Sequence, residues 1–158
     1  MNKRIKSLIN KYERIYSGRP WYGDSIMKIL KNVNPHIVFN KAGEKPHSIA
    51  ELVAHMIGWR DIAFNQIQGN MKARPTQKDT FNWKRFDKSE KTAWKNLLKE
   101  LDKNQKKIIS FLGKKEDGFL DAKVPAKKQN TEFLIEGIIQ HDLYHIGQIA
   151  LLNRVFKK

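Results

Sequence analysis

Apolar residues recur at intervals of three and four in four long stretches of this sequence, the spacing that places them along one side of an α-helix. No stretch alternates apolar and polar residues as a half-buried β-strand would. The sequence therefore predicts an all-α fold, a four-helix bundle in which each segment buries its apolar side. Its 158 residues, 40% of them hydrophobic, suit a single domain over residues 1–158. The expected helices cover residues 3–33, with a break at 17–20, and then residues 48–68, 87–113 and 131–155. Asp87 or Ser89 is expected to cap the third helix, and Thr131 the last.

A link of 17 residues, 69–85, separates the second expected helix from the third. This is long for a connection between adjacent antiparallel helices. It can return the chain along the ~30 Å of a twenty-residue helix, so we expect the second and third helices to run parallel. The aromatic residues of this link, Phe81, Trp83 and Phe86, are expected to pack against the bundle.

The last expected helix contains the stretch His141-Asp142-Leu143-Tyr144-His145-Ile146-Gly147-Gln148. At about 100° per residue, His145 lies roughly 40° round the helix from His141, and Gln148 lies about 20° to the other side. Apolar residues share this side, so both histidines are expected to face the interior. A single inward histidine is most often a neutral core residue, but a pair at i and i+4 can also bind one metal ion.

An open metal site usually has three protein ligands, and the second expected helix offers a candidate for the third. Ser48 with Glu51 three residues later predicts the start of that helix, because the two side chains cap it from both sides. His55 then falls on the inward side, with Glu51 one turn before it and Trp59 one turn after. We therefore expect Glu51, Trp59 and Gln148 to line the pocket or to contact the histidines.

The sequence contains no cysteine, which excludes disulfides, thiolate metal ligands, iron–sulfur clusters and a cysteine nucleophile. No apolar run approaches the ~18 residues of a membrane span. The first residues are not followed by the apolar core of a signal peptide. We therefore expect a soluble, cytoplasmic protein without a membrane partner.

A net charge of +15 is typical of proteins that bind nucleic acid. However, 24 of the 31 basic residues are lysines spread along the whole chain, whereas groove reading and bidentate phosphate binding favour arginine. We therefore expect a solvated basic surface rather than a dedicated nucleic-acid site.

Two segments of the sequence resemble the signature segments of the DinB-like superfamily. The first runs from Pro46 to His55 and is followed by Trp59, and the second is the His141 to Gln148 stretch with Ile149. This resemblance covers essentially the whole chain. It implies an up-down-down-up bundle, often a homodimer, in which a divalent metal ion is held by three histidines. Carried over to this sequence, those ligands are His55, His141 and His145.

Relatives in that superfamily include thiol-dependent transferases and isomerases that use bacillithiol, mycothiol or glutathione. We therefore expect a divalent ion (Zn, Ni or Fe) that activates a low-molecular-weight thiol for attack on a small-molecule substrate. Three alternatives remain open: a hydrolase that activates water, a non-catalytic metal- or ligand-binding bundle, and a basic DNA-binding protein. A zinc-protease interpretation of the histidine pair is disfavoured, because Asp142 is shorter than the glutamate that such a motif uses.

Overall fold

The computed structural model describes residues 2–43, 47–70, 83–86, 92–125 and 127–157. Within these ranges the chain forms six α-helices and no strand. Four helices are long: α1 (Lys3–Tyr16), α3 (Ile49–Ile67), α4 (Ala93–Leu112) and α6 (Thr131–Val155). Two are short: α2 (Ile26–Lys31) and α5 (Gly118–Asp121). The predicted all-α fold with four long helices is confirmed.

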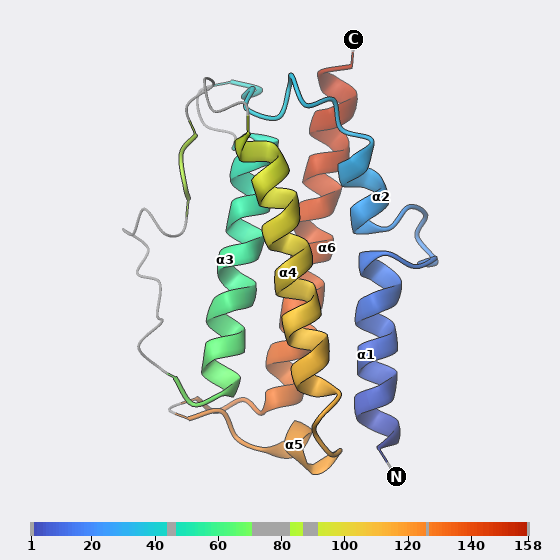
Figure 1. The fold of residues 1–158 in the computed structure, drawn as a ribbon, viewed down its shortest axis with the longest axis vertical. Coiled ribbons are helices and arrows are strands. Elements are labelled where there is room, and N and C mark those ends of the chain that lie inside the picture. Colours follow the sequence, from blue (N-terminus) through green and yellow to red (C-terminus); the bar gives the residue numbers. More distant parts are fainter. Residues whose placement is uncertain (1, 44–46, 71–82, 87–91, 126, 158) are drawn as a thin grey trace.

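The four long helices lie side by side (Figure 1). In that view α3 and α4 descend, whereas α1 and α6 ascend, and the chain passes from the lower end of α3 to the upper end of α4. Helix α3 packs against both α6 and α4, and α5 packs against α6. Helices α3 and α6, which carry the candidate ligands, are therefore direct neighbours.

The local sequence explains where the central helices begin. Ser48 and Glu51 form the predicted capping box of α3, in which the Ser48 hydroxyl accepts from the Glu51 backbone N–H at 3.2 Å and the Glu51 carboxylate accepts from the Ser48 N–H at 3.0 Å. At the start of α6 we expected Thr131 to be the cap, and this was wrong. The Asn130 side chain accepts from the Phe133 N–H, whereas the Thr131 hydroxyl donates to the Ala122 carbonyl.

The caps expected for the third long helix lie at positions 87 and 89, outside the described residues. Helix α4 begins at Ala93, with Thr92 at its N-cap, and ends at Leu112 with Gly113 at its C-cap. The break predicted within the first helix is confirmed, because residues 17–25 separate α1 from α2. Trp83 and Phe86 pack against the core as expected, and Phe81 lies outside the described residues.

One continuous apolar core draws residues from all six helices. Its fully buried members include Ile26, Leu30, Ile49, Met56, Leu101, Ile108, Leu112, Leu120, Ile135 and Ile139. Among the helices in the described ranges, none has a stretch long and apolar enough to pass through a lipid bilayer. Burial of this core holds α3 and α6 at a fixed separation, and that separation determines which side chains meet between them.

Candidate metal centre

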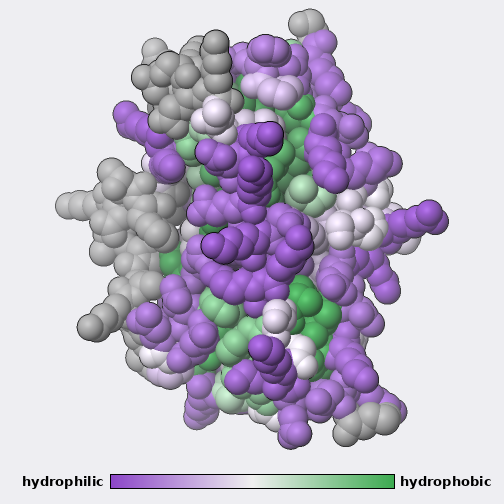
Figure 2. Space-filling model, viewed as in Figure 1, coloured by the Kyte–Doolittle hydropathy of each residue, from purple (hydrophilic) through white to green (hydrophobic). Residues whose placement is uncertain are grey.

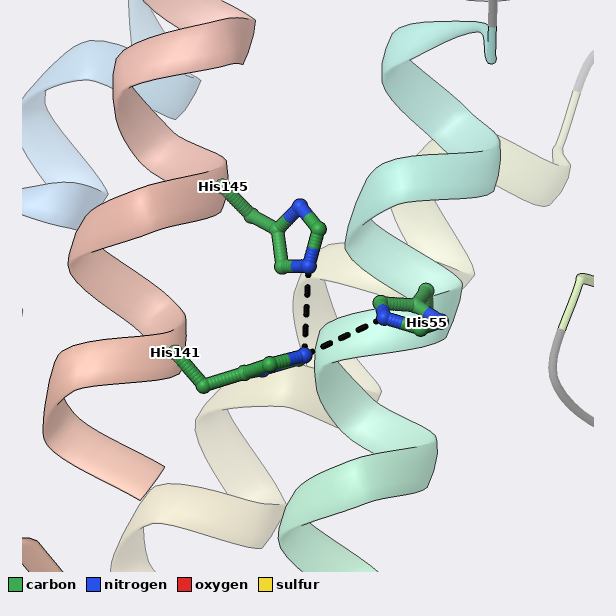
Figure 3. A group of neighbouring side chains, drawn as sticks. All are labelled: His55, His141 and His145. Atoms are coloured by element: carbon green, nitrogen blue, oxygen red, sulfur yellow. Dashed lines mark hydrogen bonds between the residues drawn. The ribbon is translucent and has the colours of Figure 1, made fainter. Parts of the chain in front are cut away.

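Three histidine side chains meet between α3 and α6 (Figure 3). His141 and His145 extend from α6 toward α3, and His55 extends from α3 toward α6. The Nε2 atom of His141 lies 3.1 Å from the Nε2 atom of His55 and 3.1 Å from that of His145. One ligand atom from each ring lies within 4.8 Å of the other two. The structure thus brings together all three histidines that were candidate ligands in the sequence.

Hydrogen bonds between the rings cannot pair all of these nitrogens. A neutral imidazole has one N–H and one lone pair, so the His141 Nε2 atom can donate or accept, but it faces two other nitrogens. The Nδ1 atom of His145 lies 2.9 Å from Gln148 Oε1, and because that oxygen only accepts, Nδ1 carries the proton. The Nε2 atom of His145 therefore presents a lone pair to the other two rings.

Burial favours the neutral form of the two imidazoles on α6. His55 and His145 are buried, and His141 is partly buried. Desolvation, reinforced by His145, His55 and Arg60, lowers the pKa of His141 to about 3. Desolvation also lowers the pKa of His145, although its bond to Gln148 opposes the shift. Neutral rings with converging lone pairs are the form of histidine that binds metal ions.

The spacing of the three rings fits a divalent ion. A tetrahedral ion with imidazole nitrogens at about 2.0–2.1 Å holds two of those nitrogens roughly 3.4 Å apart. The two 3.1 Å separations at His141 are close to that value. Gln148 fixes the tautomer of His145, as partners of metal-bound histidines commonly do. Three histidines at this spacing fit a metal-binding protein.

Aromatic rings cover the histidines. Trp83 lies between two imidazoles, with its ring 4.0 Å from that of His55 and 3.3 Å from that of His47, and both pairs are stacked within 4° of parallel. Trp59 lies edge-on to His55 at 6.2 Å and 5.8 Å from the ring of His141. Trp59 is 37% exposed, so it is less buried than its predicted place on the inward side of the helix required. Trp59 thus lies beside the histidine rings and is partly open to solvent.

Glu51 caps α3 as predicted and also contacts two residues that precede the helix. Besides capping α3, its carboxylate lies 2.9 Å from the Lys41 ammonium and 3.5 Å from Nδ1 of His47. These contacts hold the first turn of α3. Glu51 is connected to His55 indirectly, because His47 stacks on Trp83 and Trp83 stacks on His55.

A buried ion pair between the same two helices was missed by the sequence reasoning. Arg60 of α3 donates from Nε and Nη2 to Asp142 Oδ2 at 2.9 and 2.7 Å, and both side chains are completely buried. The Arg60 guanidinium also lies over the rings of Tyr12 and Tyr16 of α1. Burial raises the pKa of Asp142, and the Arg60 guanidinium opposes that shift. The sequence carried no signal for this pair, because Arg60 is followed directly by Asp61 and Asp142 lies among polar residues of α6.

A comparison with solved structures finds a similar fold. The structure described as that of the colibactin self-resistance protein ClbS in complex with a double-stranded DNA superposes with a TM-score of 0.61. The match covers 99% of this chain and 96% of that chain at 17% sequence identity. At this identity the likeness establishes the fold alone. A comparison with curated proteins finds no match.

The sequence also matches a protein-family model, that of the DinB superfamily, over residues 24–149. This range includes α2, α3, α4 and α5, and most of α6. It therefore contains His55, His141 and His145, together with Arg60 and Asp142. Since the match extends over most of the chain, the protein belongs to the DinB superfamily.

Proposed function

We propose that the protein is a divalent-metal-dependent enzyme that transfers a low-molecular-weight thiol to a small electrophile. The observation that carries the proposal is the convergence of three histidine nitrogens. Among the described residues they are the three candidate ligands at this point, the number found in open metal sites, which leaves a position for a further ligand. When bound there, a divalent ion would supply Lewis acidity, which lowers the pKa of a coordinated thiol or water.

The residues around the histidines support this chemistry. His55, His141 and His145 bring no negative charge, so an anionic fourth ligand such as a thiolate is favoured. Trp83 stacks on the His55 ring and Trp59 lies edge-on to it, so aromatic rings flank this imidazole on two sides. Because the chain has no cysteine, the thiol must come from outside. In the transfer, its sulfur forms a bond to the electrophilic carbon, the leaving group departs with the bonding electrons, and the thiol proton passes to solvent.

Incubation with a model electrophile tests the proposal. Protein loaded with Zn²⁺, Ni²⁺ or Fe²⁺ is mixed with the electrophile in the presence of bacillithiol, of glutathione, or of neither. We expect thioether formation that requires both metal and thiol and disappears in His145→Ala. Turnover without a thiol would instead establish hydrolysis. Metal binding without either reaction would leave a non-catalytic metal-binding bundle.

A second candidate function is binding of double-stranded DNA. Lys95, Lys99, Lys103 and Lys106 are exposed and fall within about 80° on one side of α4. Figure 2, viewed as in Figure 1, shows hydrophilic side chains gathered over the part of this face where α4 lies. The net charge of +15 and the DNA complex of the structurally similar ClbS also favour this candidate, and they weigh against our expectation of a merely solvated surface.

Duplex affinity measured at several salt concentrations tests the second candidate. If these lysines contact phosphates, the logarithm of the affinity falls linearly with that of the salt concentration, and replacing Lys99 and Lys103 with glutamate flattens the slope by about two. An unchanged slope would exclude this side of α4 as the DNA site. The homodimer implied by the family and the single-domain organisation also remain predictions, and light scattering and limited proteolysis address them.

A further inference from the structure

An apolar pocket with a volume of about 270 Å³ lies beside the histidines, between the start of α3 and the last third of α6. Three leucines line it: Leu52, one turn before His55 on α3, and Leu151 and Leu152 on α6. His47 and Gln148 complete the lining. The pocket therefore begins about one helical turn from the candidate metal ligands.

The two polar residues of this pocket are the ones that connect it to the histidines. Gln148 bonds to Nδ1 of His145 at 2.9 Å. His47 stacks on Trp83, which in turn stacks on His55. A molecule that occupied the pocket would therefore lie next to groups in direct contact with the candidate ligands.

The size and lining of the pocket limit what it can hold. It is slightly smaller than the ~300–1,000 Å³ of sites for drug-sized ligands. A helix or a peptide segment does not fit this volume, whereas a short alkyl chain or a single ring does. Leucine walls favour such a group, because each methylene moved out of water strengthens binding about fourfold.

We propose that this pocket binds the apolar substituent of the small molecule that reacts at the histidine site. This inference rests on the function proposed above and narrows its substrate to an electrophile with a short aliphatic or single-ring group near the reactive carbon. Leu151 is 64% exposed, so binding of that group would cover an apolar side chain that the protein alone leaves in water.

Binding of straight-chain alcohols, from ethanol to hexanol, tests the pocket without any chemical reaction. In protein with ¹³C-labelled leucine methyls, we expect Leu52, Leu151 and Leu152 to shift in NMR spectra. Affinity should rise about fourfold per added methylene until the pocket is full. Affinities that do not depend on chain length, or shifts confined to other leucines, would overturn the proposal.

A matched pair of variants locates the binding. Leu151→Asp places a charge in the pocket wall and should weaken hexanol binding at least tenfold. Val155→Asp changes an exposed residue one turn further along α6 that does not line the pocket, and should leave the affinity unchanged. Equal losses in both variants would overturn the assignment. So would a Leu151→Asp protein that changes its oligomeric state in light scattering while it keeps its hexanol affinity.

The same variants separate this inference from the proposed function. If alcohol affinity depends on chain length but no metal-dependent turnover occurs, the assignment of the pocket stands and the proposed thiol-transferase function is wrong. If turnover instead requires metal and thiol but depends neither on the chain length of the electrophile nor on Leu151→Asp, the thiol-transferase function stands and the assignment of the pocket is wrong.

Discussion

Two groups of polar side chains lie in the contact between α3 and α6, an ion pair and a cluster of three histidines, and they differ in how their charges and hydrogen bonds are balanced. Arg60 and Asp142 carry opposite charges and neutralise each other at 2.7 Å. His55, His141 and His145 form no such pair of opposite charges, and the Nε2 atom of His141 faces two other ring nitrogens at 3.1 Å. The ion pair is compensated within the chain, whereas the three histidines are placed so that they can hold a metal ion.

The same comparison separates structure from function in this interface. A buried ion pair costs desolvation free energy, which mutual attraction and hydrogen bonds offset, so removal of one partner is the severe change. Uncharged histidines cost less to bury, and a metal ion bound between them would add its binding free energy to the stability of the fold. We therefore expect substitutions at the ion pair to affect folding and substitutions at the histidines to affect metal binding.

The largest effect is expected from breaking the ion pair. Arg60→Met leaves the Asp142 charge buried without compensation, and should lower the free energy of unfolding by about 3–5 kcal/mol in urea denaturation. Lys11→Met is the control, since the Lys11–Glu136 pair joins α1 to α6 at the surface and its loss should cost less than about 1 kcal/mol. Similar losses in the two variants would show that burial does not distinguish the pairs.

The histidines should give the next largest effect, and only when metal is added. At a free metal concentration of 100 times its dissociation constant, the wild-type protein should gain about 2.7 kcal/mol of stability. His145→Ala should lose this gain because two ligands remain, and His36→Ala, at an exposed histidine outside the cluster, should keep it. Full metal-dependent stabilisation of His145→Ala would rule out His145 as a ligand.

Trp59 should contribute less than its predicted inward position suggested. As the indole is 37% exposed, Trp59→Ala should cost about 1.5 kcal/mol, below the 3–5 kcal/mol of a buried aromatic residue. Trp94, which is 7% exposed at the start of α4, is the matched control and should lie in that higher range. A loss at Trp59 as large as that at Trp94 would mean that contact with the histidine rings, rather than burial, determines its contribution.

The sequence predicted the features that depend on local patterns. Helical spacing located the four long helices, the Ser48–Glu51 capping box located the start of α3, and the i, i+4 spacing selected His141 and His145. Contacts between separate segments were harder to foresee. Nothing in the spacing of Arg60 or Asp142 indicates that they pair, because their meeting depends on how α3 is rotated against α6. The stacking of Trp83 between His47 and His55 likewise depends on the path of a link without periodicity.

The smallest net effect is expected when both members of the ion pair are replaced together. The double variant Arg60→Met/Asp142→Val keeps the summed volume of the two side chains close to that of the original pair and needs no desolvation of charge. Within the described residues, Arg60 Nη1 and Asp142 Oδ1 have no hydrogen-bond partner, so the double variant also removes two buried polar atoms without partners. We therefore expect a free energy of unfolding within about 1 kcal/mol of the wild type, although Arg60→Met alone costs several times more.

Metal titration of this double variant completes the comparison. The three histidines lie on the helices themselves, and His145 keeps its bond to Gln148, so the metal-dependent gain in stability should persist. A double variant as unstable as Arg60→Met would mean that the cost arises from lost packing against Tyr12 and Tyr16 rather than from an uncompensated charge. A stable double variant that no longer binds metal would show that the ion pair sets the rotation of α6 on which the meeting of the histidines depends.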